Sequence, residues 1–183
     1  SLELVSPRVP NEEGQSWLAS QVERGTPGAA NSVAQSDVAP LILDLEQLPI
    51  IPRAADAVVI EVRVLDEGNA APAVALNWRV DGNADFSPQP MNDDGQGVDR
   101  IAGDGIYSAA IPPHADRTVI EYFVSASDSA DNSRTWPAPT LASGQVTNAL
   151  YQVIDEFDPD AAWQPGAPPV YYQIMTGVER DAF

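Results

Sequence analysis

The sequence predicts an all-β protein, an antiparallel β-sandwich with irregular, proline-rich flanks. In the central part of the chain, apolar and polar residues alternate with the period of two that is typical of strands with one buried face. No long segment repeats an apolar residue every three or four positions, so little helix is expected. With 183 residues, 44% of them hydrophobic, the chain has enough apolar side chains for one core of ordinary size.

Five strands are expected in the central block, and the alternation shows which face of each strand is buried. Turn signals separate the strands at residues 66–69, 81–83, 94–95 and 104–105. Short strands at this spacing favour a sandwich over an α/β fold. A last strand is expected at 150–153. The inward-facing residues of the other four are expected to be Val58, Ile60, Val62 and Val64; Leu76, Trp78 and Val80; Tyr107, Ala109 and Ile111; and Ile120, Tyr122, Val124 and Ala126.

The chain divides into five segments. The first holds few large apolar anchors (Leu2, Leu4, Trp17 and Leu18), helped by a few valines, and these are too few for an independent core. Because Ser1–Leu4 has the pattern of the middle of a strand, we expect a fragment of a longer protein. In order, we expect a partial unit at residues 1–34, a linker at 35–52, the sandwich at 53–154, a proline-rich linker at 155–169, and an isolated strand within 170–183 that needs a partner sheet.

The charge excludes several classes of partner. The 27 acidic residues face nine basic ones, all arginines, which gives a net charge of −18. Binding to nucleic acid or to anionic lipid needs clustered positive charge, so neither is expected. There is no cysteine, which excludes disulfides and thiolate metal sites. No apolar run approaches the roughly 20 residues of a membrane span, so membrane insertion is not expected.

An acidic, glycine-rich loop is the candidate metal site. Asn92, Asp93, Asp94, Asp99 and Asp104 offer oxygen donors within a short stretch. Calcium takes about six to eight such oxygens. The spacing is not that of an EF-hand. Asp–Gly pairs also form turns in which the aspartate caps local N–H groups. The sequence therefore leaves two alternatives open, a calcium site or a set of turn-forming aspartates, and predicts no other cofactor.

No catalytic residue is predicted. His114, the only histidine, lies in P-P-H-A-D and is expected to be an exposed turn residue rather than a general base. A phosphate-binding loop with its lysine is excluded because the chain has no lysine. Carboxylate pairs of the kind that hydrolyse glycosides are expected by chance among so many acids. An enzyme of unrecognised type therefore remains only an alternative.

The aromatic residues allow a second alternative, a module that binds carbohydrate or protein. Trp78, Tyr107 and Tyr122 fall in inward registers and are expected in the core. Others lie in or beside irregular segments, where they could stack on a ligand or fasten the linker to the sandwich. We favour the second role, because exposed tryptophans would be costly. These aromatic residues are Trp136, Trp163, Tyr171 and Tyr172.

Three segments resemble known families. R-G-T-P-G-A-A-N-S, after L-E-L-V-S-P and Trp17, resembles the closing strands of bacterial lamin-tail domains, whose G-T-P-G-x-x-N signature matches Gly25, Thr26, Pro27, Gly28 and Asn31. The middle block, with its D-D-G…G-D-G-x-Y loop from Asp93 to Tyr107 and the later E-Y-F-V-S-A-S-D, resembles immunoglobulin-like or fibronectin-III-like modules of exported bacterial proteins. P-V-Y-Y-Q-I-M-T resembles the entry strand of the spore coat protein H (CotH) family of atypical kinases.

The resemblances imply a function together. Lamin-tail, sandwich and CotH-like domains occur in this order in large secreted bacterial proteins. This implies a non-catalytic module for spacing, positioning or interaction, located outside the cell or at its surface. Its expected partners are neighbouring domains of the same protein, and a cell-surface protein or polysaccharide. The nucleotide and metal residues of the CotH family would lie beyond Phe183, so no kinase activity is expected of this chain.

Overall fold

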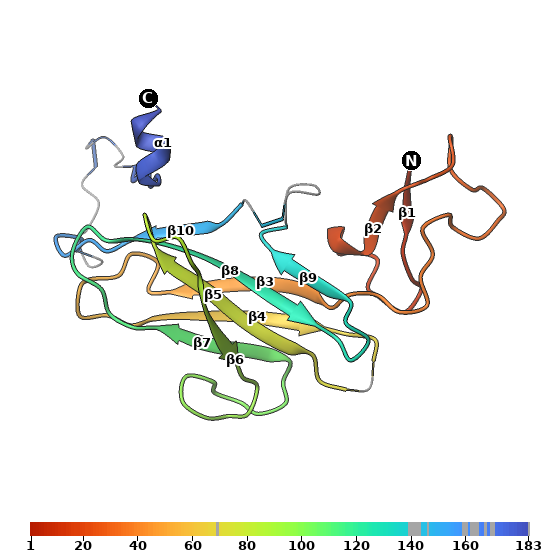
Figure 1. Cartoon of the computed structure of the whole chain (residues 1–183), viewed down its shortest axis with the longest axis horizontal. Helices are drawn as coiled ribbons and strands as arrows, with labels where there is room; N and C mark the ends of the chain where they lie inside the picture. The colour runs from red at the N-terminus through yellow and green to blue at the C-terminus, as the bar shows by residue number, and fades with distance from the viewer. Residues whose placement is uncertain are drawn as a thin grey trace.

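The protein is an antiparallel β-sandwich with a small hairpin at one end and a short helix at the other (Figure 1). The computed structural model describes residues 1–68, 70–138, 144–145, 147–158, 161, 165–166, 168 and 171–182. The predicted all-β sandwich is confirmed. In the part of the chain that is described, no helix is long and apolar enough to cross a membrane.

The two sheets of the sandwich are antiparallel throughout. The first has the order β3-β4-β7, with strands Leu41–Leu48, Val58–Leu65 and Ile106–Ile111. The second has the order β10-β8-β5-β6, and β9 also pairs with β8. Its strands are β5 (Ala73–Val80), β6 (Ser87–Met91), β8 (Val119–Ser127), β9 (Ser133–Trp136) and β10 (Ala149–Gln152).

The core lies between the sheets and contains the predicted inward-facing residues. All of them are buried except Trp78 and Val80, which are half-buried and pack against the core. Tyr151 and Val153, from the last predicted strand, are also buried there. The alternation of the sequence therefore gives the correct register for β4, β5, β7 and β8.

β3 corrects the prediction of a linker at 35–52. Residues 41–48 pair with β4 as an edge strand of the sandwich. The register shifts between Leu43 and Glu46, and Asp44 has a positive φ of 48°. A bulge of this kind inserts a residue and reverses the side-chain alternation. Three consecutive buried residues therefore precede an alternating half, which conceals the period of two.

β6 and β9 are two strands that the sequence did not predict. β6 contains Pro88 and Pro90, which lie opposite Asn77 and Ala75 of β5. Proline has no N–H to donate, so it is confined to edge strands or bulges. β6 is the last strand of its sheet, and its position explains how it tolerates both prolines.

The N-terminal segment forms a hairpin of β1 (Leu2–Leu4) and β2 (Trp17–Ala19), with the 3-10 turn η1 (Gly14–Ser16) before β2. Two of the expected anchors, Leu2 and Leu18, are exposed, so that prediction was wrong for them. Four valines form the buried cluster, together with two residues of β3. The cluster comprises Val5, Val9, Val33, Val38, Leu41 and Leu43.

The C-terminal segment also differs from the prediction. Residues 171–176 form no strand, although an isolated strand was expected there. The chain enters the short helix α1 (Gly177–Asp181) instead. Thr176 accepts a hydrogen bond from the Glu179 N–H, and the Glu179 carboxylate accepts from the Thr176 N–H. This capping box satisfies two backbone donors and explains why the helix begins at this position.

Candidate functional site

The acidic loop joins β6 to β7 across residues 92–105, and its two ends are held together. Asn92 donates its N–H to the Ser108 carbonyl at 3.1 Å and accepts from the Ser108 N–H at 2.9 Å. Arg100 lies 3.5 Å from the Glu61 carboxylate, which ties the middle of the loop to β4. The loop is therefore anchored both at its base and at its centre.

The end of the loop folds around the Asp93 carboxylate. One oxygen accepts the N–H groups of Gly103 at 2.6 Å and Asp104 at 3.2 Å, and the other accepts from Gly105 at 2.9 Å. A carboxylate has about four lone-pair positions, so three N–H donors leave room for one further partner.

Asp99 organises the first half of the loop. It is buried, and it accepts a hydrogen bond from the Gly95 N–H. Gly95 has a φ of 69°, and a Cβ atom there would lie 3.1 Å from the Ala102 nitrogen. Only glycine fits this close approach without strain. The glycine pattern of the sequence is therefore explained by the way the loop folds back on itself.

Three of the five predicted ligands come together. Asp93, Asp99 and Asp104 each offer a carboxylate oxygen, and these oxygens lie within 4.8 Å of one another. Asp94 lies outside this group and accepts from the Gln96 N–H at 2.9 Å. Asn92 is exposed and takes part through its backbone.

The geometry suits both alternatives that the sequence left open. Asp93, Asp94, Asp99 and Asp104 all accept backbone N–H groups, as turn-forming aspartates do. Three converging carboxylates are also the donor type that a hard divalent cation prefers. Backbone carbonyls and water would have to complete its shell of about six to eight oxygens.

His114 is not the exposed turn residue that the sequence predicted. It is half-buried, and its ring lies 5.3 Å from the Trp78 ring in an edge-on arrangement. Its Nε2 atom is buried without a hydrogen-bond partner, and burial lowers the pKa of the ring. The prediction was wrong because the Trp78 ring, which is distant in sequence, covers part of the histidine. No described hydroxyl or carboxylate bonds to the ring in the arrangement that a hydrolytic triad requires.

The outer aromatic residues only partly follow the expected fastening role. Trp136 is half-buried and packs against the core. Tyr172 contacts Phe157 edge-on with ring centres 6.1 Å apart but is still 51% exposed, and Tyr171 is 85% exposed. Trp163 lies outside the described residues. An exposed groove of several tryptophans, which a carbohydrate-binding module would favour, is not formed by Trp17, Trp78 and Trp136.

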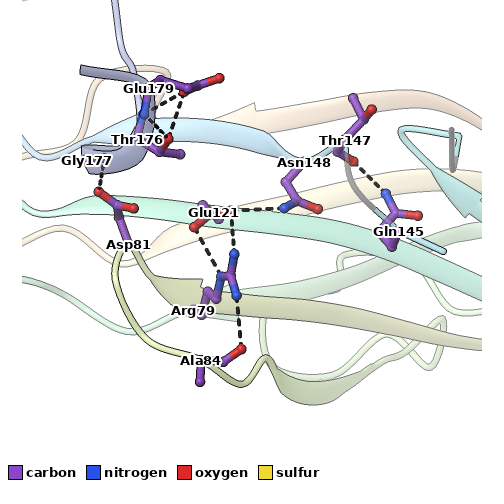
Figure 2. A network of polar contacts seen from close by, with 10 residues as sticks. All are labelled: Arg79, Asp81, Ala84, Glu121, Gln145, Thr147, Asn148, Thr176, Gly177 and Glu179. Atoms are coloured by element: carbon purple, nitrogen blue, oxygen red, sulfur yellow. Dashed lines mark hydrogen bonds and ion pairs between the residues drawn. The ribbon is translucent and has the colours of Figure 1, made fainter. Parts of the chain in front are cut away.

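Glu121 is a buried carboxylate that sequence reasoning missed, because its position in β8 matches an outward register. Figure 2 shows Arg79 donating to both of its oxygens, at 3.1 and 3.0 Å, and Asn148 donating at 2.9 Å. Arg79 also bonds the Ala84 carbonyl and covers the Phe86 ring. A carboxylate paired in this way is a structural link between β5, β8 and the segment before β10.

Glu3 is another buried carboxylate, and its partners include Thr26 of the G-T-P-G-x-x-N signature. It accepts hydrogen bonds from the hydroxyls of Ser20, Thr26 and Ser32 and from the Ser32 N–H. These bonds, first those from Thr26 and Ser32, lower the pKa of Glu3 to about 2. Asn31 also bonds the Leu4 carbonyl at 2.9 Å. The run of hydroxyl residues after an acidic strand residue was the available signal.

The N-terminal unit, residues 1–34, is joined to the sandwich by more than its apolar cluster. The Gln15 side chain donates to the Ile42 carbonyl at 2.5 Å and accepts from the Ile42 N–H at 3.0 Å. It therefore pairs with the open edge of β3 as a neighbouring strand would. Arg63 of β4 lies 3.6 Å from Glu13, and the Glu67 carboxylate accepts from the Val38 N–H at 2.6 Å.

The C-terminal helix is held at the other end of the sandwich. Asp81, at the end of β5, accepts from the Gly177 N–H at 2.7 Å (Figure 2). The Arg180 guanidinium lies 4.0 Å from the same carboxylate. A single side chain therefore links the turn after β5 to the start of α1.

Comparison with known proteins finds no matching family model and no matching curated protein.

Proposed function

We propose that this chain is a non-catalytic spacer that fixes the relative positions of its neighbours in an exported bacterial multidomain protein. In this proposal, residues 1–34 are the end of a lamin-tail-like domain, residues 53–154 and β3 are an immunoglobulin- or fibronectin-III-like module, and residues 170–183 begin a CotH-like domain. The assignment of these families rests on the sequence resemblances.

The shared core of the first unit and the sandwich is the observation that carries the proposal. Val5 and Val33 from the first unit pack with Leu41 and Leu43 of β3 in one cluster. A flexible connection would leave these faces exposed to water, at a cost of about 25 cal/mol per Å² of apolar surface. The two hydrogen bonds between the Gln15 side chain and the Ile42 backbone also fix the orientation of the first unit relative to β3, because both can form in only one orientation.

The second flank supports the same role. α1 is attached at the end of the sandwich opposite the N-terminal hairpin (Figure 1). A module held at both ends transmits orientation along its length. The strongly acidic composition, with a net charge of −18, suits a module that stays soluble outside the cell.

Nuclear spin relaxation of the backbone amides tests whether the parts move together. For a rigid spacer, the amides of β1 and β2 tumble with the same rotational correlation time as those of β4, β5 and β8. A shorter correlation time for the hairpin alone would show an independent unit on a flexible tether, and would overturn the spacer function.

The acidic loop is proposed to bind calcium and thereby to stiffen the β6–β7 end of the module. Thermal unfolding in excess EDTA and then across a calcium titration tests this. Binding to the folded state alone stabilises by about 2.7 kcal/mol at 100 times the dissociation constant. Asp99→Asn keeps an acceptor for the Gly95 N–H but removes the charge, so the calcium response should vanish with little change in calcium-free stability.

Asp85→Asn is the matched control, because Asp85 is exposed and lies outside the carboxylate group. It should leave the calcium response intact. A midpoint that does not move with calcium would leave the aspartates as turn formers, and the spacer function would then rest on the two joints alone.

A further inference from the structure

A groove runs along β9 on the side facing the N-terminal unit. All four residues of β9 line it, and the opposite wall includes Val5, Leu18 and Val38. In Figure 1, β2 is the strand of the hairpin that lies nearer to β9. The groove therefore exists only because the N-terminal unit is packed against the sandwich.

Arg134 gives this groove an uncompensated positive charge. Its guanidinium donates to the carbonyls of Pro40 at 2.9 Å and Ala39 at 3.4 Å. Within the described part of the chain, no carboxylate pairs with it. Burial lowers the pKa of its guanidinium. Six other arginines do have a carboxylate within 4.0 Å: Arg24, Arg63, Arg79, Arg100, Arg117 and Arg180.

Arg134 is half-buried, so its charge carries a desolvation cost that a carboxylate entering the groove would offset. The chain has 27 acidic residues and only nine arginines, so an arginine without a carboxylate partner is unexpected. Arg134 is therefore a site at which charge complementarity favours an anionic group. Arginine binds carboxylates through two parallel hydrogen bonds, which fixes the orientation of the ligand.

The groove also offers unpaired strand edges. β9 pairs with β8 on one side, and no described strand pairs with its other side. β2 pairs only with β1 among the described strands. The Thr135 hydroxyl is buried in the groove wall without a hydrogen-bond partner. Such edges accept an added extended peptide through backbone hydrogen bonds.

We propose that the groove between β9 and the N-terminal unit binds an extended peptide segment that carries a carboxylate side chain, with its backbone along β9 and its carboxylate on Arg134. A peptide fits better than an acidic sugar for two reasons. The open edge of β9 presents backbone N–H and C=O groups, and a peptide backbone supplies the matching partners. The Trp136 ring is half-buried and packs against the core, which leaves less of its surface for stacking on a sugar.

The test uses a short blocked peptide of alternating threonine and valine with one central glutamate, titrated into the intact chain and followed by calorimetry. Arg134→Gln should weaken binding by about tenfold or more, as expected for a charge-assisted hydrogen bond. The same peptide with glutamine in place of glutamate should lose as much affinity for the unaltered chain, and should lose little more with Arg134→Gln. Arg117→Gln, which changes an arginine outside the groove, should bind with unchanged affinity.

Amide chemical shifts of the unaltered chain provide a test that does not depend on the folding of a variant. On addition of the glutamate peptide, the amides of Ser133–Trp136 and Leu18 should shift most. No binding at millimolar peptide, shifts confined to another surface, or equal affinity for the glutamate and glutamine peptides would each overturn the proposal. Arg134-dependent binding of an oligogalacturonate in place of the peptide would also overturn it, and would identify the ligand as an acidic polysaccharide.

Discussion

Val33→Ala provides a quantitative test of the core shared by the N-terminal unit and the sandwich. Val33 is only 5% exposed, and its burial depends on contacts with β3 across the joint. The substitution removes two carbon atoms, worth about 0.8 kcal/mol each, and the cavity left behind adds to this. We therefore expect a loss of about 2 kcal/mol in the free energy of unfolding.

Urea unfolding followed by the amide resonances of β1 and β5 is the suitable assay, because it reports each part separately. With a urea dependence of about 2 kcal/mol per molar, the midpoint should fall by roughly 1 M. It should fall equally for both strands if the two parts unfold as one unit. Val22→Ala is the matched control, since Val22 is 48% exposed, and it should leave the midpoint unchanged. A midpoint that falls for β1 while that of β5 stays constant would refute the shared core.

Three further predictions concern single side chains. Trp78→Ala should cost about 3 kcal/mol, at the low end of the range for buried aromatics because Trp78 is half-buried, and thermal unfolding checks this. Glu3 has a pKa of about 2 in the folded protein and 4.5 unfolded, so its stabilisation should be complete above about pH 5 and be lost as the pH falls towards 2. Glu3→Gln should therefore flatten the dependence of the unfolding free energy on pH in this window, and an unchanged slope would contradict the assigned hydrogen bonds. Burial, followed by the charges of Asp128 and Asp37, raises the pKa of Asp66. Its Oδ1 atom also lacks a hydrogen-bond partner. The ionised form of Asp66 therefore destabilises the folded protein. Asp66→Asn should raise the melting temperature at neutral pH, and the gain should shrink as the pH falls below the raised folded pKa; a lower melting temperature would show that the charge is needed.

The sequence predicted the parts of the fold that follow a simple period. β4 has an unbroken alternation from Val58 to Leu65, and the structure buries the expected face. β3 was not predicted because its bulge shifts the alternation midway. β6 was not predicted because its prolines are tolerated only at a sheet edge. Edge position is a property of the assembled sheet and cannot be derived from a local pattern.

The candidate sites also divide into those that a local sequence pattern predicts and those that depend on long-range contacts. The loop was recognisable because its aspartates and glycines are close together in sequence, and three of the five expected ligands do converge. Glu3 and Arg134 were not recognisable. The partners of Glu3 come from Ser20 to Ser32, and the groove around Arg134 forms between segments about a hundred residues apart. His114 was misplaced because its burial depends on Trp78, a long-range neighbour.

The distance between spin labels on the two parts tests the spacer function most directly. The chain has no cysteine, so Glu12→Cys and Asn83→Cys, both at exposed positions, can be labelled without background. A rigid joint predicts one narrow distance distribution, which should broaden when Gln15→Ala and Val33→Ala weaken the joint together. A broad distribution in the otherwise unaltered chain would contradict the spacer function.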